Sequence, residues 1–253
     1  MVGHDLGIVR RNYQRGWIGL LALLPSLAAA QHLPGLGDID PRVAADMGRP
    51  PWSSIVRLQI PGVSVCTAFM VSPTRALTAA HCLYSARLGH FAPAASIHLL
   101  SGYSDGAFAQ HVVAQSYGVA QGYDPRAPDE TRGADAALII LAAPLSGIAG
   151  LALAEAPPPD GASLTLAGFS QDRAQRLQID PSCQALGLVA DSGGRTLLRH
   201  SCAGTRGTSG GPLLVQSGDG IWRVAGLQSG ANAKQIGGIA VAAETLARLL
   251  KPQ

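Results

Sequence analysis

The sequence predicts an all-β fold, either a barrel or a sandwich, on the strength of three observations. Short apolar segments recur at intervals of about ten residues and are separated by Gly, Pro, Asp or Ser, a spacing typical of such folds. A helical pattern occurs only at the end of the chain, where Leu246, Leu249 and Leu250 would share one face of a helix over residues 243–253. Residues 153–162 include three consecutive prolines, which cannot join a sheet ladder and are expected to connect two halves. In chain order, the strand-like segments are SSIVRLQI, CTAFMV, RALTAA, SIHLLSG, HVVAQSYGV, AALIIL, SLTLAGF, TLLRHSC, GPLLVQ, WRVAGLQS and GGIAVAA.

The first thirty residues predict a secretory signal peptide. Arg10, Arg11 and Arg15 precede the apolar run GWIGLLALLPSLAAA, which ends in small residues, so cleavage is expected after Ala30. The run is short for a membrane span, although an uncleaved N-terminal anchor is the alternative. We therefore expect an exported protein, periplasmic or extracellular, with no membrane contact after cleavage.

The charge of the chain lies largely in this leader. Without residues 1–30 the sequence holds 16 basic and 15 acidic residues, and no cluster of Lys or Arg interleaves with aromatic side chains. This balance argues against a nucleic-acid partner. No further segment is long and apolar enough to span a bilayer.

Four cysteines remain in the exported part: Cys66, Cys82, Cys183 and Cys202. An even number in an exported chain predicts disulfides, and four cysteines allow three pairings. We favour Cys66–Cys82 with Cys183–Cys202, because this pairing closes two short loops. Close ligand pairs such as C-x-x-C are absent from the sequence, so we expect no metal and no cofactor.

The segment GTRGTSGGPLL, residues 204–214, crowds glycines around Ser209. It could be no more than a tight turn, but a serine nucleophile would need a histidine nearby in space to take its proton. None of the seven histidines follows Ser209, which argues against an α/β-hydrolase esterase, where the base follows the serine. The only lysines, Lys234 and Lys251, offer little support for a Ser/Lys pair.

Two upstream residues could complete such a site. His81 lies in ALTAAHCL, an unusual context of small residues followed by a cysteine, whereas His90, His98, His111 and His200 occupy ordinary strand or loop settings. Asp135 directly precedes the apolar run AALIIL, where an unpaired buried carboxylate would be costly. Asp135 could orient the histidine and stabilise its cation. Its alternative role is an ordinary carboxylate facing water at a strand edge.

These motifs together resemble the trypsin/chymotrypsin-like serine peptidases over roughly residues 50–250. TAAHC around His81, DAALIIL from Asp135 and GTSGGPL around Ser209 match the family's motifs in its chain order. PPWSSIVRL and LTLAGFS resemble the strands that open its two barrels. The resemblance implies two packed six-stranded antiparallel barrels over residues 43–152 and 163–242, a linker at 153–162 and a C-terminal helix at 243–253. Cys66 and Cys82 stand where the family's disulfide holds the histidine loop.

The resemblance also implies a function, that of a secreted serine endopeptidase acting through an acyl-enzyme. His81 would take the proton of Ser209, Asp135 would orient the imidazole, and the backbone N–H groups of Gly207 and Ser209 would form the oxyanion hole. The partner would be a protein or peptide substrate, and we expect a monomer. A catalytically inactive binding protein on the same fold is the alternative.

The chain departs from the trypsin pattern next to the nucleophile. Thr208 stands where the trypsin-like enzymes have the aspartate that pairs with a new α-amino group after activation cleavage. The bond Arg42–Val43 loosely resembles an activation site, so residues 31–42 are expected to be a short pro-segment or an N-terminal extension. The bacterial glutamyl-endopeptidase-like branch also lacks this aspartate, and the chain resembles that branch more closely.

The resemblance assigns the substrate pocket to several residues without a charge. Ala203 stands at the pocket base, where a lysine or arginine side chain of a substrate would find no acid. Gln228 replaces the histidine of the glutamyl enzymes, which argues against glutamate specificity. A neutral pocket for a small or medium side chain is therefore expected. Further pocket residues are Ser229, Gly230 and Ala231 alongside the substrate backbone, and Gly238 in the wall.

Overall fold

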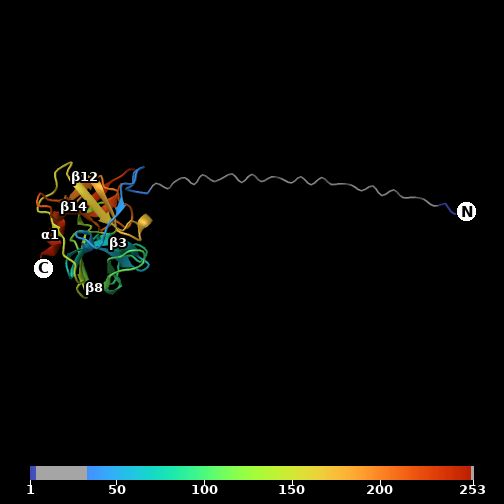
Figure 1. Cartoon of the computed structure of the whole chain (residues 1–253), viewed down its shortest axis with the longest axis horizontal. Coiled ribbons are helices and arrows are strands. Elements are labelled where there is room, and N and C mark those ends of the chain that lie inside the picture. Colours follow the sequence, from blue (N-terminus) through green and yellow to red (C-terminus); the bar gives the residue numbers. More distant parts are fainter. Residues whose placement is uncertain (4–32, 252–253) are drawn as a thin grey trace. The chain divides into compact units, whose positions relative to one another are not determined.

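The computed structural model describes residues 1–3 and 33–251, and the fold begins within the second of these ranges (Figure 1). The predicted signal peptide lies outside the described residues apart from its first three. No helix in the described part of the chain has the length and apolar character needed to cross a membrane.

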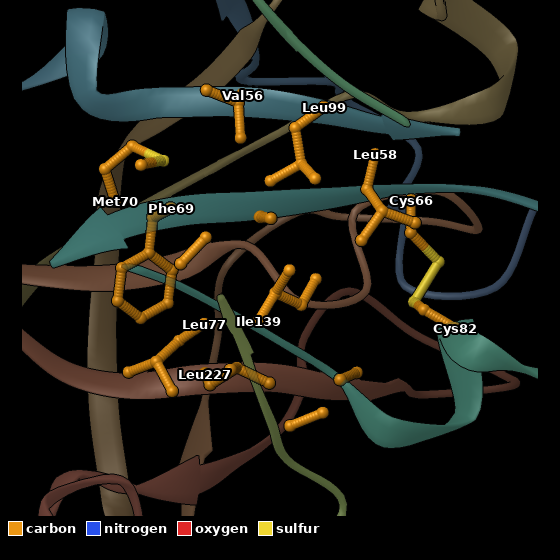
Figure 2. Packing of buried hydrophobic residues seen from close by; sticks show 14 of the residues in the cluster. Val56, Leu58, Cys66, Phe69, Met70, Leu77, Cys82, Leu99, Ile139 and Leu227 are labelled. Carbon is orange, nitrogen blue, oxygen red and sulfur yellow. A yellow bond between two sulfur atoms is a disulfide. The ribbon is translucent and has the colours of Figure 1, made fainter. Parts of the chain in front are cut away.

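The first half of the fold is a closed antiparallel barrel of six strands. Its inward side chains include Leu58, Phe69, Leu77, Leu99 and Ile139, none of which exposes any surface (Figure 2). Fully burying one such side chain contributes about 1.5–3 kcal/mol, so this core is a firm frame for the segments that leave it. In barrel order the strands are β2 (Ile55–Ile60), β3 (Ser64–Ser72), β4 (Arg75–Thr78), β9 (Ala137–Leu141), β8 (Gln110–Val119) and β7 (His98–Ser101).

The second half is also an antiparallel barrel, closed where its first strand pairs with its last. Leu164, Leu166, Leu213 and Ala240 fill its interior. In barrel order the strands are β12 (Gln178–Ala190), β11 (Ser163–Gly168), β14 (Pro212–Gln216), β15 (Trp222–Ala231), β16 (Gly238–Ala242) and β13 (Thr196–His200). Figure 1 labels β12 and β14 in this barrel and β3 and β8 in the first. Two six-stranded barrels with a C-terminal helix confirm the predicted fold class.

Two short strands join the second barrel from outside the predicted limits. β1 (Val43–Ala44) pairs with β12, although residue 43 was expected to open the first barrel, whose own strands begin at Ile55. β10 (Ala152–Leu153) pairs in parallel with β15, at the start of the expected linker. A further two-stranded pair, β5 (Tyr84–Ser85) with β6 (His90–Phe91), follows the histidine segment.

The C-terminal helix is shorter than predicted. α1 spans Ala243–Leu250, and Lys251 has an extended backbone with ψ of 142°. The residue before a proline is disfavoured in the helical region, and Pro252 follows Lys251. The helix therefore ends before the last residues of the expected range, 252–253, which lie outside the described part.

Both disulfides follow the sequential pairing that the sequence favoured. Cys66 on β3 is bonded to Cys82, as Figure 2 shows, and Cys183 on β12 is bonded to Cys202. The first of these ties the segment after β4 back onto the barrel wall. The four cysteines are thereby all paired.

Candidate active site

His81 lies on a short 3-10 helix, Ala80–Leu83, directly after β4. Its ring Nδ1 is 2.6 Å from Oδ2 of Asp135, and its backbone N–H donates to Oδ1 of the same carboxylate at 2.9 Å. The His81 side chain is 34% exposed, whereas that of Asp135 is only 4% exposed. One carboxylate thus fixes both the backbone and the ring of the histidine, and a ring so held keeps its Nδ1 protonated.

Asp135 follows the 3-10 helix Arg132–Ala134 and precedes β9. Besides His81, it accepts a hydrogen bond from the hydroxyl of Ser229, whose Oγ is 2.5 Å from Oδ2. Burial favours the neutral acid and so raises the pKa of Asp135. The charge of the His81 ring and the hydrogen bonds from His81 and Ser229 outweigh that effect, and the pKa of Asp135 lies below its ordinary value.

The turn that carries Ser209 is fastened to the first barrel through Thr67 of β3. The N–H of Thr67 donates to the carbonyl of Ser209 at 2.9 Å, and its hydroxyl donates to the carbonyl of Gly207 at 2.9 Å. Thr67 is the neighbour of Cys66, whose disulfide partner Cys82 directly follows His81. The serine turn and the histidine segment are therefore anchored to adjacent residues of one strand. Within the described residues, no hydrogen bond joins the Ser209 hydroxyl to the His81 ring, and such bonds are often long before substrate binds.

Gly207 has the positive φ that the predicted oxyanion hole would require. Its φ is +90°, and a Cβ added there would lie 2.4 Å from the carbonyl oxygen of Phe169. Among the described residues, neither the N–H of Gly207 nor that of Ser209 donates to an acceptor of the chain. Two backbone donors of one tight turn are thus available to a developing negative charge.

Thr208, which stands where the trypsin-like enzymes have an aspartate, is bonded to another hydroxyl and not to a charged group. Its Oγ1 lies 2.8 Å from Oγ of Ser170, and this contact is buried. A neutral hydroxyl pair thus satisfies the side chain of Thr208.

A cavity of about 210 Å³ opens next to Ser209. Three of the residues assigned to the pocket, Gln228, Ser229 and Ala231, line it. The other three, Ala203, Gly230 and Gly238, do not line it. Ala203 is buried, and its N–H donates to Oδ2 of Asp180 at 2.7 Å.

The two remaining predicted pocket residues are glycines in tight packing. A Cβ on Gly230 would lie 2.6 Å from the guanidinium of Arg132, and one on Gly238 would lie 2.4 Å from the carbonyl oxygen of Gly230. Sequence reasoning missed Pro34, Thr205 and Arg206, which also line the cavity. Pro34 carries no motif and lies far from Ser209 in the sequence, so no signal in the sequence could have found it.

The cavity wall at Gln228 is held by a buried histidine. Nε2 of His200 is 2.7 Å from Oε1 of Gln228, and Nδ1 of His200 accepts from the N–H of Cys202 at 3.1 Å. Burial of the ring, which the hydrogen bond to Gln228 only partly offsets, lowers the pKa of His200 to about 4. The ring is therefore neutral at physiological pH, and the pair adds no charge to this wall.

Two antiparallel barrels, with a histidine–aspartate pair on one and a glycine-rich serine turn on the other, define the class of chymotrypsin-like serine peptidases. The family model of trypsin matches residues 42–249, and the chain belongs to this family of serine peptidases. The family and the fold support a peptidase that acts on peptide substrates.

Many solved structures are similar to this chain, and two of them illustrate the likeness. A Glu endopeptidase in complex with MPD matches with a TM-score of 0.68 at 17% identity, over 84% of this chain and 98% of that one. The VesB protease of Vibrio cholerae matches with a TM-score of 0.61 at 22% identity, over 82% of this chain and 65% of that one. Identities this low show the fold. No curated protein matches the sequence closely enough to count as a relative.

Proposed function

We propose that this protein is an exported serine endopeptidase in which Ser209, His81 and Asp135 form the catalytic triad. The observation that carries the proposal is that the buried Asp135 carboxylate bonds His81 twice, at the ring Nδ1 (2.6 Å) and at the backbone N–H (2.9 Å). The bond to the ring holds the proton on Nδ1 and leaves the lone pair on Nε2, which makes the ring a general base.

The reaction would proceed by acyl transfer. The Ser209 hydroxyl attacks the carbonyl carbon of the scissile bond while Nε2 of His81 takes its proton. The oxyanion accepts hydrogen bonds from the N–H groups of Gly207 and Ser209. Collapse breaks the C–N bond, His81 returns the proton to the leaving amine, and water then hydrolyses the acyl-enzyme by the same route.

The cavity beside Ser209 supports a preference against the basic side chains of lysine and arginine, since Arg206 is itself among its lining residues. Its volume is about 210 Å³, and Gln228 in its wall is bonded to the neutral His200. A lysine or arginine side chain would bring a charge into the cavity with no carboxylate among the lining residues to pair with it.

Export agrees with two independent features. The first is the leader predicted in residues 1–30, and the second is the pair of disulfides, which persist in oxidising compartments. We propose the periplasm or the extracellular space as the location.

The decisive experiment is the intact mass of the exported protein before and after treatment with a fluorophosphonate, with Ser209→Ala as control. We expect one adduct on the wild type and none on the variant. An inert wild type would contradict the proposal and favour a binding protein on the same fold.

A further inference from the structure

The segment 33–42 lies against the second barrel at both of its ends. We infer that it is a permanent wall of the substrate cavity, and that cleavage at Arg42–Val43 would remove part of the site rather than activate it. The inference deepens the proposed function and rests on it for the identity of the cavity.

Gly35 is hydrogen-bonded to two segments of the second barrel, one that follows β13 and one that leads into β16. Its N–H donates to the carbonyl of Asn232 at 2.6 Å, and its carbonyl accepts from Gly204 at 3.3 Å and Gly237 at 3.4 Å. Gly204 begins the segment that leads to Ser209, whereas Asn232 and Gly237 belong to the connection between β15 and β16. The segment is therefore bonded both to the chain that leads to Ser209 and to the connection between β15 and β16.

Only glycine fits this bridge. The φ of Gly35 is +80°, and a Cβ there would lie 2.1 Å from the carbonyl oxygen of Gly204 and 2.9 Å from Cβ of Ala231. The backbone and a side chain of the second barrel thus pack closely around Gly35, as expected if the segment is a permanent part of the folded structure.

Pro34, the preceding residue, lines the cavity together with Ser209, Gln228 and Ala231. The cavity keeps a volume of about 210 Å³ with Pro34 in position. The segment therefore narrows the cavity without filling it. An autoinhibitory segment would instead occupy the space that the substrate needs.

At the other end, Arg42 is sequestered. Its side chain is 1% exposed and bonds Asp40 at 2.9 Å and Asp172 at 2.6 Å, while Arg173 donates to its carbonyl at 3.1 Å. Burial opposes its charge, but the two carboxylates outweigh this and raise the pKa of Arg42 above its ordinary value. Val43 is paired with β12. An activating protease needs the arginine in its own pocket and a flanking backbone free to pair with its own, whereas here Arg42 is buried and Val43 is already paired with β12.

The anchor of Arg42 also continues to the serine turn. Asp172 lies in the 3-10 helix Gln171–Arg173, whose Gln171 N–H donates to the carbonyl of Arg206 at 2.6 Å. Arg206 directly precedes Gly207. The segment 33–42 thereby supports the predicted oxyanion turn, in addition to lining the cavity.

The first test asks which chain is active. After fluorophosphonate treatment of the exported protein, we expect the adduct on a chain that still contains residues 33–42. An adduct confined to chains that begin at Val43 would overturn the inference. The absence of an adduct on any chain would contradict the proposed triad and would leave the inference about the segment to a second test. That test is whether the folded protein protects the Arg42–Val43 bond from cleavage.

That protection is measured by limited trypsin digestion of the folded protein followed by mass spectrometry. Arg126 is exposed in a loop and provides an internal reference. We expect the bond after Arg126 to be cut well before Arg42–Val43. Earlier cutting at Arg42 would show that the segment is loosely held and would overturn the inference whether or not the protein is a peptidase.

The third test concerns the cavity. Pro34→Ala should raise kcat/KM for bulky over small side chains at the cleavage site by about tenfold, the scale of discrimination that one or two methylene groups give. Gly35→Val should lower kcat/KM, whereas Gly118→Val on β8 is the matched control, since a Cβ there would meet nothing within 4 Å. Unchanged profiles for both Pro34→Ala and Gly35→Val, or higher activity after removal of residues 33–42, would refute a wall role.

Discussion

The hydroxyl of Ser229 lies 2.5 Å from Oδ2 of Asp135, so a residue of the second barrel supports the buried acid of the first. Ser229 belongs to β15, and Asp135 precedes β9. The position of the His81 ring therefore depends on the contact between the two barrels as well as on its own segment. In the proposed mechanism Ser229 acts as a positioning residue.

Replacing this serine should weaken the histidine–aspartate pair. We expect Ser229→Ala to lower kcat/KM by about tenfold or more, because a hydrogen bond to a charged group contributes about 1.5–3 kcal/mol. Ser229→Thr keeps the hydroxyl and is the control. The pH dependence of kcat/KM should shift in the alanine variant and stay unchanged in the threonine variant. Equal activity and an equal pH profile in all three proteins would argue against a positioning role.

The lowered pKa of Asp135 links stability to pH. An acid whose pKa falls on folding contributes stability above its unfolded pKa, about 3.9, and this stability is lost as the pH falls toward the folded pKa. Asp135→Asn should therefore lower Tm most near pH 7, with the difference from the wild type narrowing below about pH 4. Thermal scans across this range measure it. A difference that is independent of pH would contradict the assignment of charge to Asp135.

The sequence predicted the fold class because both of its signals, short apolar segments and closely spaced turn residues, are local. It missed β12, which contains Pro181 and Gly187. The pairing with β11 shifts register between Leu164 and Leu166, opposite Cys183 and Asp180, so Pro181 lies at a bulge that needs no ladder bond. A proline that reads as a strand breaker is thus accommodated by tertiary pairing.

In the candidate site too, the residues within local motifs could be predicted, whereas those placed by tertiary contacts could not. Motifs in chain order identified His81, Asp135 and Ser209 as candidates, and the structure joins the first two by hydrogen bonds. Pro34 could not be predicted as a cavity residue, because its place depends on how the backbone of Gly35 bridges distant loops. Nor could the sequence show that the Ser229 hydroxyl bonds Asp135.

Burial of His200 predicts a second dependence on pH. Its pKa of about 4 lies below the ordinary value of 6.5, so below pH 6.5 the unfolded chain takes up a proton that the folded chain does not. The free energy of unfolding should therefore fall by up to about 1.4 kcal/mol for each unit by which the pH is lowered between these two values. His200→Gln should remove this part of the slope, whereas His90→Gln, at an exposed position, should retain it. Denaturant unfolding at several pH values decides, and equal slopes in both variants would contradict the prediction.

Gly210 should be irreplaceable, because it lies where the serine turn presses against the first barrel. Its φ is +80°, and a Cβ would lie 2.2 Å from the carbonyl oxygen of Thr67 and 2.9 Å from the backbone N of Ala79. Gly210→Ala must therefore displace the turn from β3, with a cost on the order of 1–3 kcal/mol for the strained backbone and more for the clash. Gly118→Ala is the matched control, since a Cβ there meets nothing within 4 Å. We expect Gly210→Ala to lower both Tm and the rate of fluorophosphonate labelling, while Gly118→Ala changes neither. A normal labelling rate in Gly210→Ala would mean that the attachment of the serine turn to Thr67 does not set the position of the nucleophile.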